Sequence, residues 1–329
     1  MSTEIAKTLA EIFQCDGFTF DEAGCATHKL PSNQVVEMRW LDEDSALLVA
    51  LPLGALNAEL EEIRAFMLLI GNRAPQFTGG GAFGLDRETR EVYLSRIFPV
   101  SLSAPNLQDA LGALGPFCLA GETARAYFGT VNEAQPNDEL DGFNFPGVPV
   151  EEVEAIADEM EADAAAMEFG TNEAYLAEYS AFLGEAIQSL GLKFEGVDED
   201  HSLCITGDNE DLIAQIRFDR SMGEIILTTA VGEFDDEAIL EMAVELLADN
   251  LFLEVTGNCV LGISDADPCA VFLTMAVTME GLVPEATNFA NLIGGFLQNA
   301  EFWCESLGER TNSNSLPPPP PVAGMQNFV

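Results

Sequence analysis

Two stretches of this chain resemble each other in the same order, and this repeat limits the possible folds more than any other feature. Each stretch holds two leucines and an asparagine, then a Thr-Gly pair, then a glycine before a turn and an apolar strand. The matching residues are Leu68-Leu69-Ile70-Gly71-Asn72, Thr78-Gly79 and Gly84 in the first stretch, and Leu246-Leu247-Ala248-Asp249-Asn250, Thr256-Gly257 and Gly262 in the second. Agreement of several signals in order indicates a duplicated domain.

A helix is predicted at the start of each copy, because apolar residues recur there at four-residue steps and so share one helix face. They are Ile5, Leu9 and Phe13 in one copy and Tyr179, Leu183 and Ile187 in the other. Each helix then meets a glycine, Gly17 or Gly191, which suits a left-handed helix end.

The order of elements in each copy predicts an α+β fold class. In the second copy, β-rich runs at 202–205, 212–218 and 224–231 precede a helix that Asp235 can cap. Strands segregated from helices, with short turns, are typical of an antiparallel sheet. We therefore expect two helix–antiparallel sheet–helix sandwiches that form a pseudo-dimer.

The third helix is expected to differ between the copies. Residues 284–307 show an uninterrupted apolar pattern, whereas 106–127 contain Gly115-Pro116 in the middle. A proline inside a helix removes a backbone hydrogen bond. We therefore expect a kink or a break in the first copy.

These patterns divide the chain into four parts. We expect one copy at 1–128, an acidic linker with a possible helix at 129–172, the second copy at 173–310 and a Pro-rich disordered tail at 311–329. The tail holds Pro317 to Pro321. A solvated extension is favoured over a ligand for a proline-reading domain.

The charge of the chain excludes several classes of partner. It has 13 Lys and Arg against 56 Asp and Glu, a net charge of -43. Nucleic acids and anionic membranes would repel it, because their binding requires cationic side chains. Two interpretations stay open: the charge keeps apolar patches soluble, or it steers a basic protein partner. With 48% apolar residues the chain can still form packed cores.

Cysteine usage indicates a reducing compartment. The chain has 7 Cys, an odd number, without a C-x-x-C motif, and most lie in apolar runs. We find no secretory signal and no apolar run near the roughly 20 residues that span a membrane. We therefore expect a cytoplasmic protein without disulfides.

No motif indicates catalysis, a cofactor or a metal. Gly79-Gly80-Gly81 lacks the Lys-Ser/Thr ending of a phosphate loop, so a sheet turn is favoured. His28 and His201 have no nucleophile at a recognisable spacing, and exposed hairpin histidines are the favoured interpretation. The acidic runs at 158–163 and 198–200 lack a calcium-loop pattern. We therefore expect no enzyme, and keep an unrecognised active site as a disfavoured alternative.

With these segments in place, the chain resembles the class I chaperones of bacterial type III secretion, the CesT/SycE-like or Tir chaperone family. The resemblance rests on an amphipathic first helix followed by motifs like those of the family. They are Phe20-Asp21-Glu22-Ala23-Gly24, the strand Val35-Val36-Glu37-Met38, Pro52-Leu53-Gly54 and Gly84-Leu85-Asp86-Arg87-Glu88-Thr89. It covers nearly all of the first copy and is weaker in the second, where Val231-Gly232-Glu233 replaces Pro-Leu-Gly.

The resemblance implies a virulence-associated chaperone that binds the N-terminal region of a secreted effector in extended form, without ATP. Components of the secretion apparatus are further possible partners. The family is dimeric, so a tandem chain would be a monomeric pseudo-dimer or a homodimer. A YbjN-like or chaperone-like regulatory adaptor without a secreted client is the alternative in the same binding class.

Two sets of residues follow as candidate sites. For cargo we propose apolar residues near the predicted hairpins and strands, although core packing is the favoured role of each one taken singly: Phe18, Phe20, Leu30, Phe77, Phe83, Leu192, Phe194, Val255 and Leu261. For the contact between the copies we propose apolar residues of the second helices: Leu60, Ile63, Met67, Ile70, Ile239, Met242 and Leu246.

Overall fold

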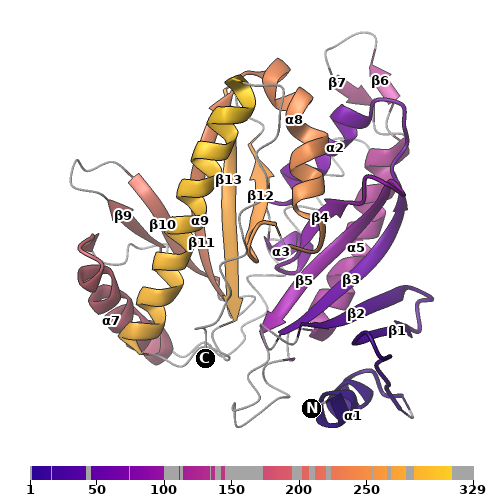
Figure 1. Cartoon of the computed structure of the whole chain (residues 1–329), viewed down its shortest axis with the longest axis horizontal. Coiled ribbons are helices and arrows are strands. Elements are labelled where there is room, and N and C mark those ends of the chain that lie inside the picture. Colours follow the sequence, from indigo (N-terminus) through magenta and orange to yellow (C-terminus); the bar gives the residue numbers. More distant parts are fainter. Residues whose placement is uncertain are drawn as a thin grey trace.

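The computed structural model contains two large antiparallel sheets, each covered on one face by helices (Figure 1). The residues that it describes are 2–15, 17–41, 46–73, 75–99, 111, 114–133, 135–137, 142–144, 173–194, 202–206, 212–219, 224–253, 255–264, 268–278 and 285–312. The predicted acidic helix of the linker, His201, both acidic runs and the five prolines of the tail lie outside these residues.

The first half contains a five-stranded sheet in the order β1-β2-β3-β5-β4. Its elements are α1 (Ser2–Ile12), β1 (Cys25–Lys29), β2 (Val35–Leu41), β3 (Ala46–Ala55), α2 (Glu61–Gly71), α3 (Pro75–Thr78), β4 (Ala82–Leu85), β5 (Glu91–Pro99) and α5 (Leu114–Glu133). Helix α5 packs on β3 and β5. The short strands β6 (Gln135–Asn137) and β7 (Gly142–Asn144) form a separate hairpin that the sequence did not predict.

The second half contains a six-stranded sheet in the order β12-β13-β11-β10-β9-β8. Its elements are α7 (Glu173–Ser189), β8 (Lys193–Phe194), β9 (Ser202–Thr206), β10 (Leu212–Asp219), β11 (Glu224–Phe234), α8 (Asp236–Asp249), η1 (Leu251–Leu253), β12 (Val260–Ile263), β13 (Cys269–Thr278) and α9 (Ala286–Asn312). Helix α9 crosses this sheet and packs on β11 and α7 (Figure 1). The predicted α+β class and the pseudo-dimer are confirmed.

The two sheets share an irregularity as well as a strand order. The pairing of β3 with β5 shifts between Pro52 and Gly54, and that of β11 with β13 shifts between Ala230 and Gly232. The glycine of Pro52-Leu53-Gly54 and that of Val231-Gly232-Glu233 thus occupy the same bulge. Equivalent residues in the two halves can therefore be read from strand register.

The residues that end the first helix of each half were predicted to be Gly17 and Gly191, and only the second prediction agrees with the structure. Helix α1 ends at Ile12, and the left-handed residue that follows it is Gln14 instead of Gly17, with Cys15 N–H donating to the Ala10 carbonyl at 3.0 Å. In the second copy Gly191 forms the predicted left-handed end, with Leu192 N–H donating to Ile187 at 3.1 Å.

The predicted kink at Gly115-Pro116 is wrong, because α5 begins at Leu114 and so places Pro116 in its first turn. A proline there removes a backbone donor that has no partner within the helix in any case. Helix α5 continues to Glu133, beyond the expected boundary at residue 128, and α9 continues to Asn312. The domain boundaries themselves stay a prediction.

The two halves meet along a seam formed by α2, β4 and β5 of the first half and α8, η1 and β12 of the second. Figure 1 shows α2 and α8 side by side at this seam. A Cβ at Gly84 would lie 2.7 Å from Cα of Leu251, and one at Gly262 would lie 3.1 Å from the backbone nitrogen of Arg73. The repeated glycines therefore permit the backbones of the two halves to approach closely.

The repeated asparagines hold the same seam. The Asn72 side chain accepts from Phe83 N–H at 2.7 Å, and Asn250 accepts from Leu261 N–H at 2.8 Å. Asn72 also donates across the seam to the Leu261 carbonyl at 3.2 Å. Both asparagines are almost completely buried. Each satisfies the backbone of a short strand that would otherwise bury unpaired polar groups.

We predict that Asn72→Ala lowers the free energy of unfolding by about 2–4 kcal/mol, since it leaves buried backbone groups of Phe83 without partners. Urea denaturation monitored by tryptophan fluorescence would measure this change. Asn291→Ala, at an exposed position of α9, is the control and should change stability by less than about 0.5 kcal/mol. Equal effects of the two substitutions would contradict the role assigned to Asn72.

Candidate functional site: the β1 edge and the open sheet faces

The outer edge of β1 is the first candidate site. The strand order places β1 at one end of the first sheet, and no strand among the described residues pairs with its outer side. The corresponding strand of the second sheet, β9, is covered by β8, which pairs Lys193 with Thr206 and Phe194 with Ile205. The two halves therefore differ at this edge.

Register shows which backbone groups of β1 point outward. Leu30 N–H donates to Gln34 at 2.8 Å and Trp40 N–H donates to Gly24 at 2.8 Å, which fixes the hydrogen-bonded pairs between β1 and β2. Because these pairs alternate along an antiparallel ladder, Thr27 and Lys29 direct their N–H and C=O groups away from β2. Two residues of β1 thus offer backbone donors and acceptors to another strand.

An aromatic cluster lies beside this edge. It consists of Phe13, Phe18, Phe20 and His28, with ring centroids 4.7 Å apart for Phe13 and His28 and 5.8 Å apart for Phe18 and Phe20. Phe18 is buried, whereas the other three are half-buried. The cluster gives an apolar surface with one polar ring next to the outward backbone groups.

The turn before β1 explains its position. The Asp21 side chain accepts from Ala23 N–H at 2.9 Å and from Cys25 N–H at 2.8 Å, and Gly24 adopts a positive φ of 76°. A carboxylate that binds backbone two and four residues ahead closes a tight turn. The Phe-Asp-Glu-x-Gly motif therefore holds the aromatic residues against the start of β1.

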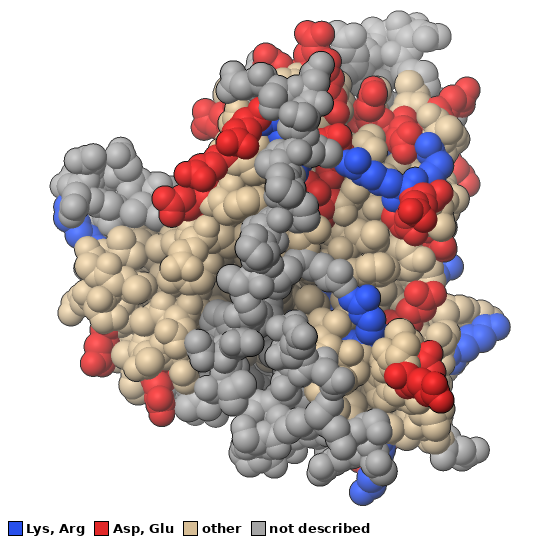
Figure 2. Space-filling view, viewed as in Figure 1, with Lys and Arg blue, Asp and Glu red and all other residues tan. Residues whose placement is uncertain are grey.

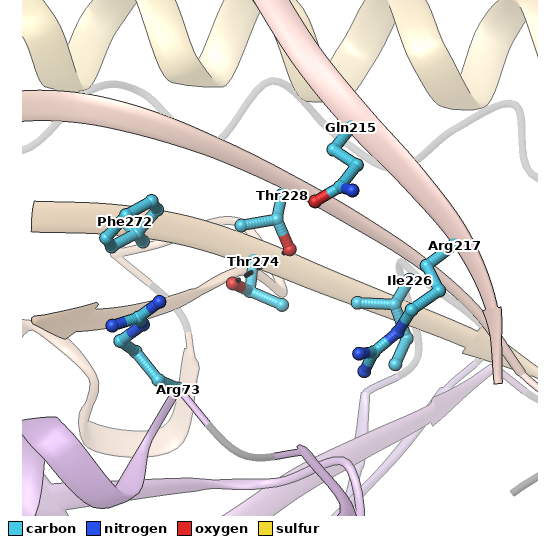
Figure 3. Close-up of a pocket in the computed structure, with 7 residues that line it drawn as sticks. All are labelled: Arg73, Gln215, Arg217, Ile226, Thr228, Phe272 and Thr274. Atoms are coloured by element: carbon cyan, nitrogen blue, oxygen red, sulfur yellow. Dashed lines mark hydrogen bonds between the residues drawn. The ribbon is translucent and has the colours of Figure 1, made fainter. Parts of the chain in front are cut away.

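The second candidate site is a pocket on the open face of the second sheet (Figure 3). Gln215 and Arg217 of β10 alternate with buried Ala214 and Ile216, so they lie on the face away from α9. Arg73 reaches the pocket from the first half and lies over the Phe272 ring, with its Cζ 4.5 Å from the ring centroid. The remaining lining residues are Ile226, Thr228 and Thr274.

Two guanidinium groups, two hydroxyl groups and one amide thus surround this pocket, and they suit a carboxylate or another small anion. Sequence reasoning missed it. The alternation of polar and apolar residues in 214–218 is the signal that could have indicated an open sheet face. Arg73 could not be found this way, because only the seam brings it to the second sheet.

The same face of the first sheet carries carboxyl groups that the second sheet lacks at the matching positions. By register, Glu37 and Tyr93 correspond to Gln215 and Phe272. Burial raises the pKa of the Glu37 carboxyl, and the Glu91 carboxylate raises it further. Burial and the same carboxylates raise the pKa of Tyr93 to about 12. The two open faces have therefore diverged at these two positions, whereas both keep an arginine at the place of Arg217, which is Arg39 in the first sheet.

Acidic side chains are not spread evenly over the face of the molecule that Figure 2 shows. In Figure 2 they gather over the end of the molecule where α2 and α8 lie, and large uncharged areas remain elsewhere in the view. Helix α8 alone contains Glu237, Glu241 and Glu245 among its acidic residues. The charge thus leaves large uncharged areas of this face instead of covering all of it.

The structure separates the predicted cargo residues into surface and core. Phe18 and Phe20 belong to the aromatic cluster, and half-buried Leu30 directly follows β1. Phe77 packs with Phe83 and Tyr127, and both Phe83 and Leu261 are completely buried. Phe83 and Leu261 are therefore core residues, because their strands lie in the seam. Leu192 and Val255 are half-buried, and of Phe194 only the backbone is described.

The predicted contact residues lie on the helices that meet at the seam. Ile239, Met242 and Leu246 of α8 are buried, whereas Leu60, Ile63, Met67 and Ile70 at α2 are half-buried. Completely buried on α2 are Arg64, Ala65, Leu68 and Leu69. Arg64 donates from Nε to the Asn132 carbonyl at 3.1 Å and so joins α2 to α5.

Other sequence candidates show no reactive arrangement in the described part of the chain. His28 is half-buried within the aromatic cluster, not fully exposed as expected. No group of three His, Cys, Asp or Glu suited to a metal ion occurs among the described residues. In the same ranges, no helix has the length and apolar character that crossing a membrane requires.

We predict that Glu37→Gln raises the melting temperature by about 1 °C at pH 7. A raised carboxyl pKa means that the folded protein disfavours the charged form, so removing the charge stabilises it at neutral pH. The difference should shrink as the pH is lowered from 7, because the raised pKa makes the folded protein protonate Glu37 before the unfolded chain does. Calorimetry across this range would measure it, with exposed Glu133→Gln as control. A difference that grows on acidification would contradict the assignment.

Comparison with known proteins finds a family that the first half resembles. Residues 4–114 match the model of the Tir chaperone protein (CesT) family. Two solved structures with detectable similarity are the ExsC–ExsE complex, at 18% identity and a TM-score of 0.31, and the HopA1–SchA chaperone–effector complex, at 18% and 0.28. They cover 38% and 36% of this chain, and 94% and 91% of their own chains.

No curated protein matches the chain. The family match extends from α1, through all five strands of the first sheet, to the start of α5. It therefore includes the β1 edge and the aromatic cluster. Residues 4–114 of this chain are therefore similar to the Tir chaperone protein (CesT) family.

Proposed function

We propose that this protein is a type III secretion chaperone that binds the N-terminal region of a secreted effector in extended form. The observation that carries this proposal is the outer edge of β1, which in a domain similar to the CesT family presents outward backbone groups beside a half-buried aromatic cluster. An extended segment can add to such an edge as a further strand. The aromatic cluster would then accept its apolar side chains.

Unfolded cargo gives up chain entropy when it binds, so backbone hydrogen bonds alone are a weak source of affinity. Phe13, Phe20 and His28 keep part of their surface exposed, next to Thr27 and Lys29. Burial of such rings contributes roughly 25 cal/mol per Å² of apolar surface. Backbone pairing at Thr27 and apolar contacts at Phe20 therefore support one another in the proposed complex.

The difference between the two halves supports a division of roles. In the second half β8 already pairs with β9, in the position that an added strand would occupy. The first half has no such strand among its described residues. We therefore infer that the first copy holds the client and that the second completes the pseudo-dimer.

We also infer that binding needs no nucleotide and involves no catalysis. The one glycine-rich run that resembled a phosphate loop, Gly79-Gly80-Gly81, lies against the side chain of Arg96, which donates to the Gly79 carbonyl. A phosphate loop instead directs free N–H groups at its ligand. The run therefore serves the packing of the seam.

We predict that Thr27→Pro weakens client binding roughly tenfold, because it removes an outward N–H from the proposed docking edge. Thr27→Val alters the side chain but keeps the N–H, and should bind normally. Isothermal titration with a synthetic peptide of the client's N-terminal segment would measure both affinities. Melting temperatures within about 2 °C of the parent would show that the variants are folded.

Cys204→Pro makes the matching change in the second half, because Cys204 pairs with Gln215 as Thr27 pairs with Glu37. Since β8 lies at that edge, this variant should keep full affinity. Equal losses in Thr27→Pro and Cys204→Pro, or none in either, would contradict a client at β1.

We predict that a client co-purified from a secreting bacterium is held by its N-terminal segment and is not released by ATP. Limited proteolysis and mass spectrometry would show whether that segment is protected. The control is the same client without the segment, which should not bind. Retention of the truncated client, or its release by ATP but not by a non-hydrolysable analogue, would contradict this function.

A further inference from the structure

A buried ion pair joins the two halves at the seam. Arg96 of β5 donates from Nη2 to the carboxylate of Glu224 at the start of β11. Arg96 is 5% exposed and Glu224 is 0% exposed. Arg96 also donates to the Gly79 carbonyl and to the Thr278 hydroxyl, the latter at 3.5 Å, and its Cζ lies 4.9 Å from the centroid of the Phe98 ring.

The triglycine run makes room for this pair. Gly80 has a positive φ of 74°, and a Cβ there would lie 2.6 Å from Nη1 of Arg96 and 3.1 Å from Oε2 of Glu224. The second copy has Asn258 at the corresponding position, after Thr256-Gly257. Gly80, which the second copy replaces with asparagine, therefore accompanies the charge pair in the first copy.

Strand register identifies what the other copy has at each position. Ala46 pairs with Pro99 as Glu224 pairs with Thr278, so Ala46 corresponds to Glu224. Val49 pairs with Arg96 as Leu227 pairs with Met275, so Met275 corresponds to Arg96. Ala46 and Met275 are both buried. The first half thus carries the arginine and has Ala46 where the second half has Glu224. The second half carries the glutamate and has Met275 where the first half has Arg96.

We propose that the Arg96–Glu224 pair makes each half select the other half and reject a second copy of itself. If two first halves met with this geometry, each Arg96 would face Ala46. If two second halves met, each Glu224 would face Met275. Both arrangements bury charges that have no opposite charge beside them, and only the arrangement of unlike halves pairs them.

The physical basis is an asymmetry in the energetics of buried charge. A buried ion pair adds little net stability, because its desolvation offsets most of the attraction. Removal of one partner is strongly destabilising, because the other charge remains buried without compensation. The pair therefore acts mainly by destabilising the association of two identical halves. The two halves can then keep similar seam surfaces, and each still pairs only with the other.

The experiment uses two full-length variants that borrow the residue of the other copy. Arg96→Met leaves Glu224 without its partner, and Glu224→Ala leaves Arg96 without its partner, so each alone should melt below the parent. The double variant has neither charge and should melt above both single variants. Recovery in the double variant shows coupling that two independent defects would not produce.

Partner choice is measured by refolding the two single variants together from urea. If they exchange halves, one seam regains Arg96 with Glu224 and the other contains both substituted, uncharged residues, so no charge is left unpaired. We expect a 1:1 dimer of exchanged chains, in roughly tenfold excess over the dimer that either variant forms alone. Light scattering and native mass spectrometry would identify it.

Parent protein refolded with a mass-tagged parent is the control and should remain monomeric. The proposal is overturned if either single variant melts and associates like the parent, or if the mixture forms no more dimer than the separate variants do. It is also overturned if the double variant melts no higher than the single variants, since the charges would then not act on each other.

Discussion

Close approach of two backbones at the seam is the constraint on which the rest of the structure depends. Gly84 faces the backbone at Leu251, and Gly262 faces that at Arg73, so neither position has room for a side chain. Asn72 and Asn250 supply the hydrogen bonds that such closely packed strands need. Because the seam covers the β4 and β12 ends of the two described sheets, their free edges lie at the opposite ends.

Those opposite ends have diverged, and the divergence supports a division between the copies. The second sheet ends in β8, whereas the first ends in β1 with an aromatic cluster beside it. The open faces differ as well, with Glu37 and Tyr93 on one sheet and Gln215 and Phe272 at the matching places on the other. Unpaired strand edges invite association with other chains, so an edge left open requires an explanation. Binding of an extended client supplies one.

The order of elements could be predicted from the sequence, because apolar periodicity and turn residues act locally. Errors in predicting where helices begin and end arose at positions where two local preferences of the backbone compete. Gly17 suited a helix end, but the chain turned earlier at Gln14, where backbone hydrogen bonds outweighed the strain of a left-handed residue. Pro116 indicated a break, but it marked a helix start, since a first turn needs no donor there.

The candidate site was only partly predictable. The sequence predicted Phe18 and Phe20 as cargo-binding residues, but it predicted Phe83 and Leu261 as well, and these two are buried in the seam. An apolar side chain looks the same in sequence whether it packs inside or meets a partner. Arg73 and Thr27 could not be identified from the sequence. Arg73 belongs to a pocket on the sheet of the opposite half, and Thr27 contributes its backbone groups and not its side chain.

The sequence by itself determined that the chain is acidic, and it predicted a repeat built from helices around antiparallel strands, because these properties depend on composition and on residues close in the chain. Only the tertiary structure decided which edge stays open, which arginine meets which carboxylate and which glycine lies against another backbone. Those features join residues far apart in sequence, such as Arg96 and Glu224, and no local pattern specifies which distant residue will be the partner.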